Sequence, residues 1–272
     1  MEKFLLLRSS LKDILFVGDV GEEGPGDLRG MKELFSANGP KIESFISIDG
    51  SNSTGITNGA LGSHRYKVTF KGPGGHSWGA FGLANPHHAL GQAIADFVKS
   101  ADNFTKTGPK TSYNVGIIGG GTSVNSIPFE SWVVVDMRSI SPASLNQIDT
   151  LFQKAMRSGL AAQNKLRRSG PPLTLDVEMV GNRPSGHTNS SQPLVQRAIA
   201  ATSHFGNEPQ LRTSSTDSNI PISIGIPAIT LGGGGVGGNA HSLNEWYLNT
   251  DGYKGIQRVL LIVASQAGIV SK

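Results

Sequence analysis

Apolar and polar positions alternate in several stretches of the chain. Because successive side chains of a strand point to opposite faces, this alternation predicts strands. Between residues 64 and 71, Tyr66, Val68 and Phe70 alternate with charged or polar neighbours, which is typical of a half-buried antiparallel strand. The stretches 112–118, 132–137 and 173–180 predict three further strands in the same part of the chain.

The same region contains two stretches with helical spacing. Asn85 suits a helix cap and Pro86 a first turn, and the apolar positions that follow have the period of one helix face: Leu90, Ala93, Ile94, Phe97 and Val98. A second helix is predicted over 144–160. Together the elements between about 62 and 181 predict a compact α+β unit, with a four-stranded antiparallel sheet and two helices on one face.

The sequence on either side of this unit has the character of an α/β domain. Upstream, the apolar runs 13–18 and 44–48 suit buried strands, with a helix predicted over 27–37 between them. Downstream we expect a helix over 193–204, a strand over 228–231 and a closing helix over 251–268. The order strand, helix, strand favours a parallel sheet. The middle unit, 62–181, is therefore expected to be inserted into a larger domain made of 1–61 and 182–272.

Composition excludes several classes of function. The chain has no cysteine among its 272 residues, so disulfides, thiolate metal sites and a cysteine nucleophile are excluded. Its net charge of +4 comes from 24 cationic and 20 anionic residues. These are spread along the chain without a basic stripe, so a nucleic-acid partner is not expected. No apolar run reaches the length of a membrane span. Residues 1–8 are interpreted as the end of a helix of a longer protein, and the expected location is cytoplasmic.

Two adjacent carboxylates, Glu22 and Glu23, lie among glycines directly after the first predicted strand. Carboxylates beside apolar structure are costly unless a cation balances their charge. If Glu23 bound a metal ion, Glu22 could take the proton from water on that ion, which is the division of labour in metal-assisted hydrolysis. A solvated loop is the ordinary alternative.

Two further candidates lie where the same domain would place functional groups. Asp49 ends the second predicted strand, and functional groups of parallel sheets gather at the carboxyl ends of strands. His241 follows a glycine-rich loop, 232–238, and could be a neutral imidazole ligand. Within that loop, Gly233 and Gly234 would let the backbone approach a substrate carboxylate or oxyanion. Taken alone, each residue is better explained by a turn or a loop, but together the three segments are far more specific than any one of them.

These segments resemble the dinuclear-zinc peptidase and amidohydrolase family. That family includes tripeptidases, carboxypeptidase G-type enzymes, acylamino-acid deacylases and succinyl-diaminopimelate desuccinylase. The resemblance extends over essentially the whole chain and rests on motifs in the family's order, at 21–24, 48–50, 75–77, 120–125, 136–138, 215–219 and 241–245.

For the larger domain, the resemblance implies a site for two Zn²⁺ ions. Glu22 would be the general base and Glu23 a ligand of one zinc. Asp49 and His241 would be the terminal ligands of the two metals. Asp217 would have a supporting role.

For the inserted unit, the resemblance implies a lid that also forms a homodimer. His76 would reach into the partner's active site and stabilise the tetrahedral oxyanion. Asn125 and Arg138 would hold the substrate backbone or carboxylate. Each has an ordinary structural interpretation as well, since His76 could cap a strand and Arg138 could pair with a local acid.

The sequence departs from the family pattern in one motif. The family has an earlier His-x-Asp, in which the histidine binds one zinc and the aspartate bridges both, and none of the 7 histidines here has Asp two positions later. The bridging Asp and one His ligand are therefore missing. The remaining candidates are too few to coordinate two zinc ions: Glu23, Asp49 and His241. We expect an incomplete catalytic domain with an exposed apolar edge. A fragment, a mis-assigned start codon and a pseudoenzyme all remain open explanations.

The leading hypothesis for function is hydrolysis of short peptides near the amino terminus, as in a tripeptidase or aminopeptidase. The close alternative is removal of an acyl group from an amino acid by the same groups. A non-catalytic dimeric protein built on the lid is the alternative from a different class, and this chain alone could be inactive.

Overall fold

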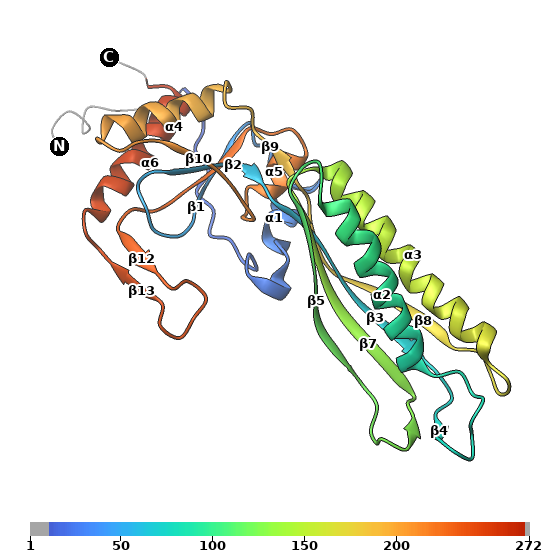
Figure 1. Cartoon of the computed structure of the whole chain (residues 1–272). Coiled ribbons are helices and arrows are strands. Elements are labelled where there is room, and N and C mark those ends of the chain that lie inside the picture. The colour runs from blue at the N-terminus through green and yellow to red at the C-terminus, as the bar shows by residue number, and fades with distance from the viewer. Residues whose placement is uncertain (1–10, 270–272) are drawn as a thin grey trace. The chain divides into compact units, whose positions relative to one another are not determined.

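The computed structural model describes residues 11–269, which form two compact units (Figure 1). The inserted unit is Gly62–Arg183, and the split unit comprises the chain up to Leu61 and from Pro184 onward. Residues 1–8, interpreted above as the end of a helix, lie outside the described residues. None of the described helices has the length and apolar character needed to cross a bilayer.

The inserted unit is a four-stranded antiparallel sheet with two long helices across one face (Figure 1). The strands lie in the order β5 (Thr111–Gly120), β7 (Glu130–Ser139), β3 (Gly62–Lys71) and β8 (Thr174–Arg183). Helices α2 (Pro86–Thr105) and α3 (Pro142–Leu166) lie side by side. The predicted α+β arrangement is confirmed, and the Asn85 side chain caps α2 as predicted by accepting a hydrogen bond from the His87 N–H at 2.9 Å.

Aromatic side chains fill the space between these helices and the sheet. Phe97 of α2 and Phe152 of α3 contact edge to face, with ring centroids 5.2 Å apart, and Tyr66 of β3 lies 5.5 Å from Phe152. The helices approach closely at Gly159, where an added Cβ would lie 2.5 Å from the Ala89 carbonyl oxygen. This close approach lets the two helices cover one face of the sheet together.

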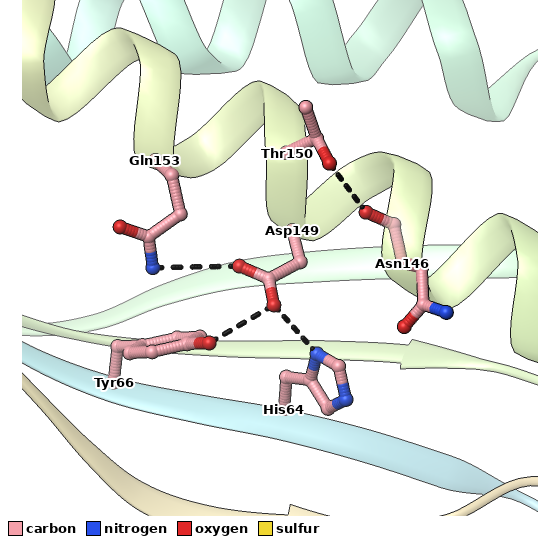
Figure 2. Close-up of polar contacts among 6 residues, drawn as sticks. All are labelled: His64, Tyr66, Asn146, Asp149, Thr150 and Gln153. Carbon is pink, nitrogen blue, oxygen red and sulfur yellow. Dashed lines mark hydrogen bonds and ion pairs between the residues drawn. The ribbon is translucent and has the colours of Figure 1, made fainter.

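Next to this core, a polar cluster connects α3 to β3 (Figure 2). The Asp149 carboxylate accepts a hydrogen bond from the Tyr66 hydroxyl and pairs with His64 Nδ1, both at 2.9 Å, and Gln153 donates to its other oxygen at 3.4 Å. Burial raises the pKa of Asp149, but the hydrogen bonds from His64 and Tyr66 outweigh it and the net pKa is lowered. Burial, with the bond to Asp149, raises the pKa of Tyr66 to about 12.

The split unit contains a five-stranded mixed sheet. Its main strands lie in the order β1 (Phe45–Ile48), β11 (Ala228–Leu231), β2 (Gly55–Ala60) and β10 (Gln210–Ser214), and β9 (Gly186–His187) also pairs with β2. β1 and β11 are parallel, as are β2 and β10, but β11 and β2 are antiparallel. The sheet is therefore mixed, and the predicted parallel arrangement holds only for the pairs β1–β11 and β2–β10. Strand β2, which the sequence pattern did not predict, reverses the direction.

Two helices pack against the apolar residues of this sheet. In α4 (Pro193–His204), Leu194 and Val195 are buried against Ile56 and Ile229 of the sheet, and Ile262 of α6 (Gly252–Ala267) joins the same core. Both helices lie close to their predicted positions. They provide an apolar layer against the sheet, in which Asp49 directly follows β1 and the glycine loop directly follows β11.

The predicted strand 13–18 is wrong. These residues are irregular, and Leu15 and Phe16 are 60% and 89% exposed. An apolar run forms a strand only when another strand satisfies its backbone groups, and no strand within 11–269 pairs with this run. Edge strand β1 of the described sheet ends at Ile48, which is 58% exposed.

The next helix, α1 (Arg29–Leu34), is shorter than the predicted 27–37. Asp27 and Leu28 have φ angles of 50° and 60°, which lie in the left-handed region and cannot continue a right-handed helix. The helix therefore begins only at Arg29.

Candidate functional site

Glu22 and Glu23 lie on a tight loop of the split unit. The Leu28 N–H donates to the Gly21 carbonyl at 2.9 Å, and the Gly26 N–H donates to the Glu23 carbonyl at 2.8 Å. A Cβ on Gly26 would lie 2.4 Å from the Gly21 oxygen, so the loop closes this tightly only with glycine. The backbone thereby presents Glu23 to solvent and leaves Glu22 half-buried.

Asp217 stands among three other carboxylates. Burial and the negative charges of Asp19, Glu22 and Asp49 raise its pKa to about 7. Its Oδ1 atom is buried and has no hydrogen-bond partner among the described residues. The structure thus brings two predicted residues, Glu22 and Asp49, into the electrostatic neighbourhood of Asp217. Crowded carboxylates of this kind attract either protons or a cation.

The backbone around Asp217 is held by hydroxyl groups. Thr216 Oγ1 and Ser218 Oγ each lie 2.7 Å from Thr230 Oγ1 on strand β11. The buried Asn219 amide donates to the carbonyls of Leu61 and Pro184 at 2.8 and 2.9 Å, where the chain leaves and re-enters the split unit. These bonds fix the segment that carries Asp217, although Asp217 itself remains electrostatically unfavourable.

His241 lies close to Glu23. It sits in the turn between β12 (Val236–Gly238) and β13 (Trp246–Leu248), and its φ of 64° is left-handed. His241 Nδ1 is 3.9 Å from Glu23 Oε2, and both side chains are largely exposed. Two ligands of one tetrahedral zinc, each bonded at about 2.1 Å, lie roughly 3.4 Å apart. The observed separation is therefore near what a shared ion requires.

The residues present do not, however, complete a metal centre. Within residues 11–269, no group of three or more histidine, aspartate or glutamate side chains is arranged to hold an ion. The carboxylate and imidazole donors are types that zinc accepts. The set formed by Glu23, Asp49 and His241 therefore fits part of one site and does not fit a two-ion centre.

The glycine loop packs against the start of helix α6. The Gly233 N–H donates to the Gly50 carbonyl at 3.0 Å, which ties the loop to the turn after Asp49. A Cβ on Gly234 would lie 2.6 Å from the Gly252 carbonyl oxygen, and the buried Arg258 guanidinium donates to the Gly232 carbonyl at 2.9 Å. Close backbone packing accounts for the glycines here, and it positions the Asp49 turn.

In the inserted unit, the structure brings His76 and Asn125 together. His76 ends the short strand β4 (Gly75–His76), and Asn125 directly precedes β6 (Ser126–Ile127), in which Ser126 pairs with His76. The Ser77 N–H donates to the Asn125 carbonyl at 2.9 Å. Both predicted residues are exposed. His76 Nδ1 accepts hydrogen bonds from the backbone N–H groups of Trp78 and Gly79, each at 3.3 Å.

Arg138 does not join His76 and Asn125 within the inserted unit. It lies near the end of β7, eight residues after the strand's first residue, Glu130 (138 − 130). At about 3.3 Å per strand residue this is roughly 26 Å along the strand. Its Nε donates to Asp136 at 2.7 Å, and Asp136 also accepts from Arg65 at 2.8 Å. Arg138 therefore has the local acidic partner that its ordinary structural interpretation predicts.

In the split unit, two residues near the acidic cluster, Asp19 and Asn219, were not predicted as site residues from the sequence. Asp19 directly follows the run 13–18, so it could have been found in the same way as Asp49, as an acid just after an apolar run. Asn219 lies in the motif 215–219, but its role was not predictable, because its contacts join backbone far apart in the sequence.

The fold of the chain is similar to that of several solved peptidases and amidases. Residues 58–164 match the M20 family model described as a peptidase dimerisation domain. The chain is similar to an aminopeptidase PepT from Bacillus cereus, with 19% identity, a TM-score of 0.70, and coverage of 92% of this chain and 63% of that one. For a tripeptidase from Staphylococcus aureus the identity is 22%, the TM-score 0.71 and the coverages the same, 92% and 63%.

An amidase of the hydantoinase/carbamoylase family from Burkholderia vietnamiensis is also similar, with 18% identity, a TM-score of 0.61, and coverage of 84% of this chain and 55% of that one. Among curated proteins, none matches the chain. The predicted fold class is thus confirmed, and the chain spans about 63% of the length of the two peptidases.

Proposed function

We propose that this chain, which has the M20 peptidase fold and carries the peptidase dimerisation domain of that family, is part of an enzyme that hydrolyses a peptide bond in short peptides. Its split unit would be the catalytic domain, and its inserted unit the lid through which two copies form a homodimer. The observation that carries the proposal is the acidic cluster around Asp217, with Glu22 and Asp49 as neighbours. Crowded carboxylates of this kind are unfavourable for folding and favourable for binding a cation.

Each residue of the split unit has a proposed role. Glu23, Asp49 and His241 would hold zinc together with ligands beyond those described, and bound zinc supplies a water of lowered pKa. Glu22 would accept the proton of the attacking water, since it lies in the same loop as Glu23 and close to the acidic cluster. The packing of Gly233 on the turn after Asp49 would keep these groups in register.

The inserted unit would provide substrate contacts. His76 would donate a hydrogen bond to the carbonyl oxygen as negative charge develops on it, which is the role of an oxyanion-hole donor. Asn125, adjacent to His76, would bind the substrate backbone. Arg138 would bind the substrate carboxylate only if its pairing with Asp136 opens or is shared.

A second candidate is hydrolysis of an N-acylated or N-carbamoylated amino acid. It is supported by the similarity to the hydantoinase/carbamoylase amidase, which is comparable in identity to that of the two peptidases. Both reactions break an amide bond with the same groups, so the proposed catalytic residues are compatible with either substrate.

The test is turnover of a substrate panel with and without zinc. Tripeptides, dipeptides, N-acetyl and N-carbamoyl amino acids would each be incubated with the protein, and released amine would be measured. Glu22→Gln is expected to lower kcat by about 10²–10⁴-fold, the usual contribution of a general base. Glu33→Gln, at an exposed glutamate on α1, is the matched control and should leave kcat unchanged.

Two results would overturn the proposal. Full activity of Glu22→Gln would remove the assigned base. For the enzyme of which this chain is proposed to be part, absence of turnover of every substrate, together with less than one zinc per chain by elemental analysis, would favour a non-catalytic dimeric protein.

A further inference from the structure

We infer that the turn after His76 fixes the tautomer of its imidazole, with the proton on Nε2. The backbone amides of Trp78 and Gly79 act as positioning groups. This inference rests on the proposed function for its catalytic meaning, but its structural content can be tested without turnover.

The geometry at Nδ1 determines where the proton lies. The N–H groups of Trp78 and Gly79 both point to Nδ1, each with a nitrogen–nitrogen distance of 3.3 Å. A backbone N–H can only donate, so Nδ1 must offer its lone pair. A neutral imidazole carries one proton, and with Nδ1 as the acceptor that proton is on Nε2.

The same contacts determine the orientation of the ring. A ring turned by half a revolution about its last side-chain bond would present a carbon atom to the two amide donors. Both N–H groups would then lose their acceptor, and each lost bond is unfavourable. The observed orientation satisfies both amides, so it is the favoured one even though the ring is exposed.

The backbone around the turn explains why the amides point inward. The Ala80 N–H donates to the His76 carbonyl at 2.9 Å, and the Ser77 N–H donates to the Asn125 carbonyl at 2.9 Å. In this turn Nδ1 takes the place that the side-chain oxygen of Asn or Asp takes in an Asx-turn, where it accepts from the backbone two residues on. His76 is therefore anchored through its backbone and through one ring nitrogen.

The other ring nitrogen remains available for chemistry. With Nδ1 occupied by the turn, Nε2–H is left as a directed hydrogen-bond donor on an exposed ring. A preoriented donor is what stabilisation of a developing oxyanion requires. The two interpretations of His76, a turn-capping residue and a catalytic residue, are thus compatible because they use different nitrogens.

The test is nuclear magnetic resonance of the chain with ¹⁵N-labelled histidine, at about pH 8, above the ordinary histidine pKa of about 6.5. His76 is expected to show the Nε2–H tautomer almost alone, with the Nδ1 resonance of a hydrogen-bonded acceptor. The exposed His88 on α2 is the reference. A tautomer mixture for His76 equal to that of His88, or a dominant Nδ1–H form, would overturn the inference.

Matched variants at Gly79 test the cause. Gly79→Pro removes one donor, so the Nδ1–H population should rise. Gly79→Ala keeps the donor, and a Cβ there meets no atom within 4 Å, so the tautomer should stay as in the parent chain. An unchanged tautomer in a folded Gly79→Pro variant would contradict the assigned role of that amide.

Amide exchange gives a second test that does not depend on proline. His76→Ala removes the acceptor, and exchange of the Trp78 and Gly79 amide protons should accelerate by roughly fivefold, the equivalent of one ordinary hydrogen bond. His76→Asn keeps a side-chain acceptor within reach, so the same two amide protons should exchange at the parent's rate. Equal exchange in all three would overturn the inference. These measurements leave the proposed function untouched, because turnover of the substrate panel, the Glu22→Gln variant and the zinc content decide it.

Discussion

At the scale of single residues, Asp217 is expected to make the stability of the split unit depend on pH. Its pKa is raised to about 7 by burial and by the charges of Asp19, Glu22 and Asp49, against an ordinary value of about 3.9. A raised folded-state pKa means that the folded chain retains a proton which the unfolded chain has released. Stability from this group is therefore complete below about pH 4 and is lost as pH rises to about 7.

Asp217→Asn should remove this loss in metal-free protein. We expect the variant to be more stable than the parent at pH 8 by about 1–2 kcal/mol. At ~1.4 kcal/mol per pKa unit the full rise to about 7 would give ~4 kcal/mol, but solvent screens a partly exposed carboxyl. Urea unfolding at pH 4 and pH 8 in a chelator would measure the difference. Asp176→Asn, at an exposed position of β8, is the control. A variant less stable than the parent at pH 8 would show that the crowded carboxylates do not destabilise the folded chain.

Tyr66 leads to a prediction at alkaline pH. Its hydroxyl donates to Asp149, and burial with this bond raises the pKa of Tyr66 to about 12, against an ordinary value of about 10. The stability that it contributes is complete below about pH 10 and is lost as pH rises to about 12. Tyr66→Phe should cost about 2 kcal/mol at pH 7, as expected for a bond to a charged group, and should flatten the alkaline loss.

Unfolding by urea between neutral and alkaline pH, followed by circular dichroism, checks this prediction. Tyr253→Phe is the control, since Tyr253 is 56% exposed. If the alkaline loss were the same in Tyr66→Phe as in the parent, another group would be responsible for it.

Single residues also show how far the sequence could predict the candidate site. Glu22 and Asp49 could be predicted to lie in one acidic neighbourhood because both follow apolar runs of one domain, and the structure places both near Asp217. The burial of Asp217 was not predictable, since it arises from packing against strands elsewhere in the chain. Likewise the partner of Arg138, Asp136, could be suspected from spacing but not distinguished from a substrate carboxylate.

At the scale of elements, the contact between α2 and α3 depends on glycine at one position only. An added Cβ at Gly159 would meet the Ala89 carbonyl oxygen at 2.5 Å, whereas an added Cβ at Gly91, on the exposed side of α2, meets no atom within 4 Å. Alanine favours helices over glycine by about 0.8–1.0 kcal/mol. Gly91→Ala should therefore stabilise the inserted unit by nearly that amount, while Gly159→Ala should destabilise it by about 1–3 kcal/mol through overpacking.

Thermal unfolding of the parent and of the two single variants measures whether stability rises in Gly91→Ala and falls in Gly159→Ala. Because both variants replace a helical glycine by alanine, the comparison controls for helix propensity. Stabilisation by Gly159→Ala would mean that the helices separate at little cost.

Elements with a strong periodic pattern were predicted best. Helices α2, α3, α4 and α6 were recognisable because their caps or apolar faces are local features of the sequence. Strand β2 was missed because Gly55–Ala60 contains small and polar residues and is buried through its neighbours rather than through its own pattern. Strand β10 was missed because Gln210–Ser214 is exposed along its length and shows no alternation. The opposite error occurred at 13–18, where an apolar run has no pairing strand among the described ones.

At the scale of the whole molecule, the dimerisation domain suggests an oligomer, and the two edges of its sheet differ in character. Edge strand β8 carries Asp176, Glu178 and Arg183, and charges on an edge discourage pairing with another chain. Edge strand β5 has no charged residue along Thr111–Gly120, and its Ile117 and Ile118 are 55% and 60% exposed. An uncharged apolar edge is a template for pairing, so we expect two copies to associate through β5.

Ile118→Lys should therefore convert a dimer into a monomer, because the new charge would be buried without a partner in the paired edge. We expect the dissociation constant to rise by at least about 30-fold, the effect of losing an interface anchor worth ~2 kcal/mol or more. Sedimentation velocity over a concentration series measures the dissociation constant.

Met179→Lys on β8, where Met179 is 42% exposed, is the matched control and should remain dimeric. If Met179→Lys dissociated the dimer and Ile118→Lys did not, the interface would involve the β8 edge. If the parent chain were itself a monomer at every concentration, the residues of the inserted unit, His76 included, could act only on the active site of their own chain.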